Sequence, residues 1–137
     1  MPERAANLRA DLILKAMIAV ASADAGGIEE REVSLMQQVY QDQAQRAITP
    51  QEIAEMSDAS TRDGLLAELT AASPVLDRET KEEIIRAAYL TLIADDRIAA
   101  EERKKLKDIA MALRVPEIHF GAILEDFALW LEEQKAK

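Results

Sequence analysis

The feature that most constrains the fold is a segment of small and apolar residues that occurs twice in the chain. Residues 15–24 read KAMIAVASAD and residues 86–95 read RAAYLTLIAD, and each segment ends in Ala-Asp. An isoleucine follows each aspartate, and a glutamate stands four positions after each isoleucine. We interpret the two copies, about residues 8–47 and 77–113, as a helix, a corner and a second helix that are used twice.

The acidic residues at the two corners keep almost the same spacing. Asp24 and Asp95 are 71 residues apart, whereas Glu32 and Glu102 are 70 residues apart. The first corner therefore carries one extra residue, which falls in its Ala25-Gly26-Gly27 segment. Because the extra residue loosens the first corner, and because a further aspartate directly follows Asp95, we expect the second corner to hold a cation better.

Helical periodicity runs through nearly the whole chain. Apolar side chains recur every three to four residues, which is the spacing of an amphipathic helix. Only 4 Gly and 4 Pro interrupt a chain that is 49% apolar, and strand-forming residues are sparse. We predict an all-α, single-domain bundle over residues 1–137 with about seven helices, at about residues 8–24, 29–47, 50–57, 62–72, 77–94, 99–113 and from 116 onward.

One helix start is specified in detail by the sequence Thr49-Pro50-Gln51-Glu52. Thr49 can cap the helix, Pro50 suits the first helical position, and Glu52 completes a capping box. We therefore predict that a short helix begins at Pro50.

The charge of the chain limits the partners that it can bind. It holds 26 acidic and 17 basic residues, a net charge of −9. Such a surface repels phosphate backbones and anionic headgroups, so we expect no nucleic-acid partner and instead expect cations or basic protein surfaces. The chain has no cysteine and one histidine, His119, which argues against a zinc site.

Residues 12–25 resemble the apolar core of a signal peptide. The same segment recurs at residues 86–95, where a signal peptide cannot stand, so we interpret both as helices of the fold. No apolar run reaches the about 18–20 residues that a membrane span needs. We therefore expect a cytoplasmic protein with no direct membrane insertion.

The acidic corners suggest a cation site. Because the chain reverses direction at each corner, Asp24 can approach Glu32, and Asp95 can approach Glu102. Adjacent carboxylates repel one another unless a cation intervenes, and Ca²⁺ takes 6–8 oxygen ligands in flexible geometry. We hypothesise that these four residues bind Ca²⁺ or another hard divalent cation.

The alternative is that these acids only cap helices and complement the helix dipole. The residues three positions before Glu32 and Glu102 are Glu29 and Ala99, and neither supplies the hydroxyl of a capping box. This absence favours the cation hypothesis. The corners are not EF-hands, because the twelfth position from each aspartate is a leucine instead of a glutamate.

The duplicated pattern of Ala-Asp, a short loop, an isoleucine and a glutamate in an acidic helical chain resembles the TerB-like family of tellurite-resistance proteins. The resemblance covers about residues 10–130. It implies a seven-helix fold whose acidic corners are proposed to bind divalent cations. It also implies a role in bacterial stress-response or membrane-associated complexes without catalytic activity. The family's acids fall on Asp24, Glu32, Asp95 and Glu102.

Other residues receive structural interpretations. We expect His119 to face solvent or to be locally hydrogen-bonded, and Trp130 to pack in the core or at its edge unless it is exposed, in which case it would anchor an interface. Four methionines are predicted to fill the core (Met17, Met36, Met56 and Met111). A run of cations is predicted to form a solvated helix face (Arg103, Lys104, Lys105 and Lys107).

These observations lead to one function hypothesis and two alternatives. The leading hypothesis is a non-enzymatic, TerB-like domain whose corners bind a divalent cation as part of a protein assembly. The first alternative is a metal-free interaction module that presents the same acids to a basic partner. The second is a hydrolase that uses a carboxylate-held metal to activate water, which is disfavoured because the sequence offers no further polar ligand or base in the corners. A serine hydrolase is also unsupported, because Ser22 and Ser34 have no partner base.

Overall fold

A computed structural model describes residues 2–23, 28–94 and 100–135 of the chain. This part forms seven α-helices and one 3-10 turn and contains no strand, which confirms the all-α prediction. The elements in chain order are α1 (Pro2–Ala21), α2 (Glu30–Ala44), α3 (Pro50–Asp63), α4 (Leu65–Ala72), the turn η1 (Ser73–Val75), α5 (Arg78–Ala94), α6 (Ala100–Ala112) and α7 (Glu117–Lys135).

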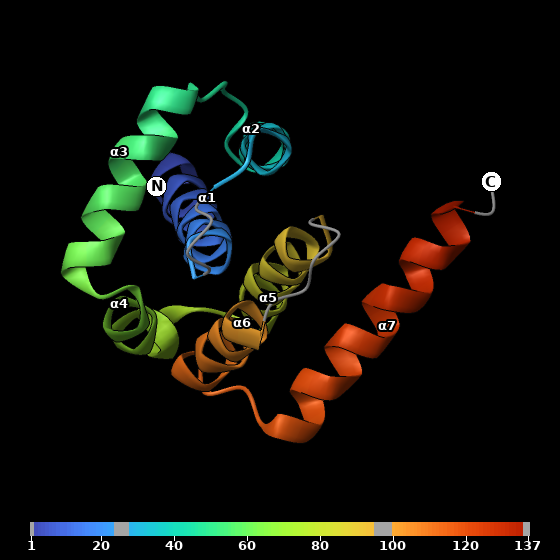
Figure 1. Cartoon of the computed structure of the whole chain (residues 1–137). Helices are drawn as coiled ribbons and strands as arrows, with labels where there is room; N and C mark the ends of the chain where they lie inside the picture. The colour runs from blue at the N-terminus through green and yellow to red at the C-terminus, as the bar shows by residue number, and fades with distance from the viewer. Residues whose placement is uncertain (1, 24–27, 95–99, 136–137) are drawn as a thin grey trace.

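Helices α1 and α5 form the centre of the bundle and pack against each other more extensively than any other pair (Figure 1). Helix α2 packs against α1, and α6 packs against α5 and α4. Helix α3 crosses α1, and α7 contacts α5 and then extends away from the body of the bundle (Figure 1). Each predicted repeat copy thus contains two helices around a corner, and the duplication itself stays a prediction.

The core lies between α1 and α5, because both helices carry wide apolar faces. Leu12, Ile13 and Met17 of α1 are fully buried, as are Ile84 and Ile85 of α5. Burial of large aliphatic side chains contributes roughly 1.5–3 kcal/mol each. An amphipathic helix was predicted over about residues 8–24, and apolar residues of α1 from Leu12 onward form its buried face. Leu8 is exposed.

The predicted capping box of α3 is confirmed. The Glu52 amide N–H donates to Thr49 Oγ1 at 3.1 Å, and the Thr49 amide N–H donates to Glu52 Oε1 at 3.2 Å. Helix α3 continues to Asp63 instead of ending near residue 57. Only Gly64, with φ of +74°, separates α3 from α4. Glycine adopts this left-handed backbone without steric cost, so the chain turns there within one residue.

Helix α5 begins at a side-chain cap. The Thr80 amide N–H donates to Asp77 Oδ1 at 2.8 Å. Hydrogen bonding from Thr80, by its side chain first and then by its backbone, holds the pKa of Asp77 below its ordinary value of 3.8. The carboxylate therefore stays charged at neutral pH and stabilises the positive end of the helix dipole.

Helix length and polarity also bear on the membrane prediction. None of the helices that the described residues form is both long enough and apolar enough to cross a membrane.

Candidate functional site

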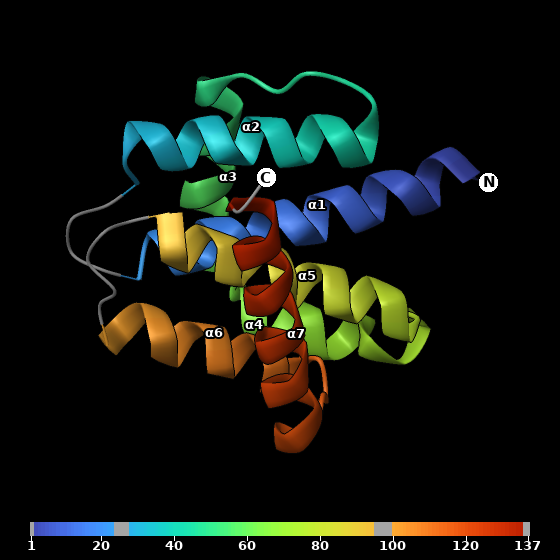
Figure 2. The same cartoon turned by 90° about the vertical axis from the view of Figure 1, so that its right-hand side faces the viewer.

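The helix ends that flank the two predicted corners lie at the same end of the bundle. Figure 2 shows that the last turns of α1 and α5 and the first turns of α2 and α6 all face one side of the molecule. The first turns of α2 and α6 carry Glu32 and Glu102. The other two predicted ligands, Asp24 and Asp95, and the isoleucine of the second corner, Ile98, lie outside the described residues.

Glu32 is held by the start of α2. Glu29 is the N-cap residue of this helix, with extended backbone angles, and its amide N–H donates to Glu32 Oε1 at 3.0 Å. The Glu29 carboxylate in turn accepts a hydrogen bond from the backbone N–H of Glu32. The expectation that Glu32 is no capping-box member was therefore wrong, because a carboxylate at Glu29 replaces the usual hydroxyl.

Glu102 occupies the matching place in the second hairpin. It is the third residue of α6, as Glu32 is the third residue of α2. Both side chains are only 1% exposed. Ile28, which precedes α2, is partly buried and packs against the core.

Capping alone does not account for this burial. Glu52 is also the third residue of its helix and also completes a capping box, yet its side chain is partly exposed. Among the residues whose burial is described, Glu32 and Glu102 are the only charged side chains in the core. Burying a carboxylate is costly unless a positive charge or a proton compensates it. Glu32 and Glu102 therefore share a degree of burial that their helix position alone does not require.

The described residues do not by themselves complete a metal site. Within residues 2–23, 28–94 and 100–135, no group of three or more Asp, Glu, His or Cys side chains comes close enough to hold an ion. Glu32 stands in the first turn of α2, and Glu102 stands in the first turn of α6.

A polar cluster between α1 and α2 serves the fold. Arg46 Nη2 donates to Tyr40 Oη at 2.6 Å, and the Tyr40 hydroxyl donates to Asp11 Oδ1 at 3.4 Å. The Arg46 guanidinium also lies 5.0 Å above the Tyr40 ring. Burial first, and then the Asp11 charge, raise the pKa of Tyr40 above 10.0. The hydroxyl therefore stays protonated at neutral pH, where it links the two helices.

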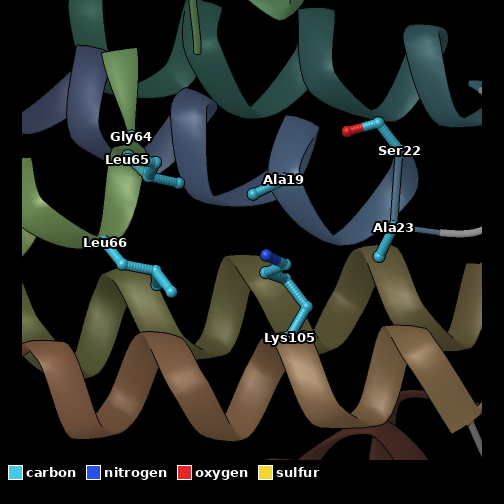
Figure 3. Close-up of a pocket in the computed structure, with 7 residues that line it drawn as sticks. All are labelled: Ala19, Ser22, Ala23, Gly64, Leu65, Leu66 and Lys105. Atoms are coloured by element: carbon cyan, nitrogen blue, oxygen red, sulfur yellow. The ribbon is translucent and has the colours of Figure 1, made fainter. Parts of the chain in front are cut away.

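A pocket of about 320 Å³ lies between the end of α1, the start of α4 and α6 (Figure 3). The Lys105 side chain reaches into it and points toward α1 (Figure 3). Ser22 lines the same pocket, but its hydroxyl donates to the Ile18 carbonyl oxygen at 2.6 Å, and no histidine or carboxylate stands among the described lining residues. Among the described lining residues, the Ser22 hydroxyl therefore has no base beside it.

The structure corrects several single-residue predictions. Met17 and Met36 are buried as predicted, whereas Met111 is 65% exposed. Arg103, Lys104 and Lys107 are solvated as predicted, whereas Lys105 is partly buried in the pocket of Figure 3. Trp130 is 51% exposed. Trp130 still takes part in packing, because Phe127 of α7 stacks on it and in turn meets Tyr89 of α5 edge-on.

Comparison with known proteins does not place the chain in a family. No protein-family model, curated protein or solved structure matches it. The resemblance to the TerB-like family therefore rests on the sequence pattern at the two corners.

Proposed function

We propose that this protein is a non-enzymatic, TerB-like module that binds a divalent cation, Ca²⁺ or another hard ion, at its acidic corners. The single observation that supports this proposal best is the burial of Glu32 and Glu102 at the same position of two helices. Their partners would be Asp24 and Asp95, which the sequence places shortly before them, together with loop carbonyl oxygens and water.

The biological role follows from the family resemblance. A TerB-like module would act inside a bacterial stress-response assembly, related to those of tellurite resistance, and would bind its ion without turning over a substrate. The net charge of −9 supports this role, because an acidic surface concentrates cations around the molecule.

Thermal melting tests the proposal. An ion that binds only the folded chain stabilises it by mass action. We expect the melting temperature in millimolar Ca²⁺ to exceed that in a chelator, with smaller rises in Mg²⁺ because Mg²⁺ demands stricter octahedral geometry. Mn²⁺ serves as a second hard cation. Identical melting curves in chelator and in all three ions would contradict the proposal.

We infer a second candidate function, a docking site for a basic partner, from the outer part of α7. Leu129 is 54% exposed and Trp130 is 51% exposed. Four exposed carboxylates flank them on the same helix (Glu125, Asp126, Glu132 and Glu133). Exposed tryptophans are frequent anchors of protein interfaces, and the carboxylate rim complements positive charge. The partner that fits this surface is a basic amphipathic helix.

Trp130 makes this candidate testable by fluorescence, because it is the one tryptophan of the chain. We expect an amphipathic peptide built of leucine and lysine to shift the emission to shorter wavelength in a saturable way. A peptide of leucine and glutamate with the same pattern is the control. Leu129→Ala should weaken binding by roughly tenfold, because it removes the apolar side chain beside the tryptophan anchor. Equal responses to both peptides, or none to either, would rule out this surface.

A further inference from the structure

A second pocket, of about 470 Å³, lies where the start of α5 faces the α6–α7 corner. Its walls are supplied by the first two turns of α5, by the segment between α6 and α7, and by the first turn of α7. The residues that line it are Arg78, Lys81, Glu82, Arg114, Val115, Pro116 and His119. It lies at the start of α5, whereas the acidic corner follows the end of that helix.

The lining of this pocket is positive, although the chain as a whole is strongly negative. Glu82 supplies the one carboxylate, and it is already engaged by Arg78 at 3.6 Å and by Arg86 at 3.5 Å. Lys81 and Arg114 have no carboxylate within 4.0 Å in the part of the chain that the structure describes. Two uncompensated cations therefore face the same space.

Arg114 holds its place against a local conformational preference. It follows α6 with φ of +61°, at the position where helices usually carry glycine. The Val115 amide N–H donates to the Ala110 carbonyl oxygen at 3.0 Å, which closes the helix end. This left-handed conformation is a common way for a helix to end, and Gln45 ends α2 in the same way with φ of +60°. The guanidinium of Arg114 gives the pocket its second free cation.

His119 adds a polar group with incomplete hydrogen bonding. It lies on the first turn of α7 and lines the same pocket. Its Nε2 atom is buried and has no hydrogen-bond partner among the described residues. Val115 and Pro116 provide an apolar wall beside it. The pocket thus combines positive charge, a polar ring and an apolar surface.

We propose that this pocket binds a small phosphate monoester that carries an apolar group. Arginine and lysine are the side chains that bind phosphate best, arginine through its planar fork and lysine as a point charge. A phosphate monoester carries a charge of about −1.5 to −2 at neutral pH, which matches two free cations better than a single carboxylate does. The apolar group would lie against Val115 and Pro116, and the volume falls within the range of small-molecule sites.

Titration with phenyl phosphate, followed by NMR of the full chain, tests the proposal. We expect saturable shifts of the Val115 and His119 signals. Lys81→Gln and Arg114→Gly should each weaken binding by roughly tenfold, because each removes one charge-assisted contact. Glycine suits the backbone of residue 114, so the second variant loses the charge while its fold is kept or improved. Lys104→Gln, an exposed lysine of α6 outside the pocket, is the matched control.

Three results would overturn the proposal. The first is the absence of saturable shifts at millimolar phenyl phosphate. The second is equal weakening by Lys104→Gln and by the two pocket variants, which would show diffuse electrostatic attraction only. The third is binding of benzoate or of inorganic phosphate as tightly as phenyl phosphate. Equally tight binding of benzoate would show that the pocket does not require the charge of a phosphate. Equally tight binding of inorganic phosphate would show that the apolar contact does not contribute.

Discussion

Replacing both buried glutamates by glutamine, as E32Q with E102Q, is expected to abolish the stabilisation of the protein by Ca²⁺. At a free ion concentration of about 100 times Kd, one site stabilises the folded chain by about 2.7 kcal/mol. For a chain of this size that is a rise in melting temperature of roughly 8 °C. Glutamine keeps the shape of glutamate but removes the charge that holds a cation, so the variant should melt at the same temperature in Ca²⁺ and in chelator.

The substitution is chosen to leave the helix starts intact. Glu32 Oε1 accepts a hydrogen bond from the Glu29 amide N–H, and the amide oxygen of a glutamine can accept the same bond. Neutral side chains also cost less to bury than carboxylates, so in chelator the variant should melt no lower than the wild type. The matched control is E30Q with E101Q, which changes exposed acids on the same two helix turns. Loss of the Ca²⁺ response in the control would show that the buried pair is not the site.

Ile84→Ala is expected to have the largest effect on stability. Ile84 is completely buried on α5, the helix that packs most extensively against α1. Truncation removes its transfer free energy and leaves a cavity, which costs about 3–4 kcal/mol. Small domains have only roughly 5–15 kcal/mol of stability. Urea unfolding followed by circular dichroism should therefore show a much lower midpoint for this variant.

Leu129→Ala is the control for this experiment. Leu129 is an exposed leucine of α7, so its truncation should change the free energy of unfolding by under about 0.5 kcal/mol. If Ile84→Ala costs no more than Leu129→Ala, then the α1–α5 contact is not the centre of the core.

Much of the fold could be predicted from the sequence because local signals and periodicity agree. Thr49 and Glu52 specify a helix start through bonds within one turn, and the structure contains those bonds. The apolar periodicity predicted an amphipathic helix at about residues 77–94, and Ile84 and Ile85 lie on the buried face of that helix. The predicted end of α3, near residue 57, was wrong, because the helix continues to Asp63. The residues after position 57 are mostly polar and therefore give no periodic apolar signal.

The candidate site was predictable only in part. The sequence spacing singled out Glu32 and Glu102, and both prove to be buried at the same helix position. The capping role of Glu29 was missed, because a carboxylate in place of a hydroxyl is outside the usual capping-box pattern. The sequence placed Asp24 and Asp95 at the corners, and the described residues do not include them.

The pocket at the start of α5 and the exposure of Met111 could not be predicted, because both depend on how the helices pack. Lys81 and Arg114 are distant in the sequence, and only the packing of α5 against the α6–α7 corner brings them to one pocket. Periodicity likewise assigned Met111 to the core, whereas it faces away from the packed side of α6 and is exposed. No local pattern distinguishes an apolar residue on a packed helix face from one that remains exposed.

Calorimetric titration of Ca²⁺ into the chelator-treated protein tests the central claim most directly, because it measures ion binding itself. We predict saturable heat in the wild type, retained in E30Q with E101Q and lost in E32Q with E102Q. Absence of heat at millimolar Ca²⁺ in the wild type, or unchanged heat in E32Q with E102Q, would contradict the assignment of the buried glutamates as cation ligands.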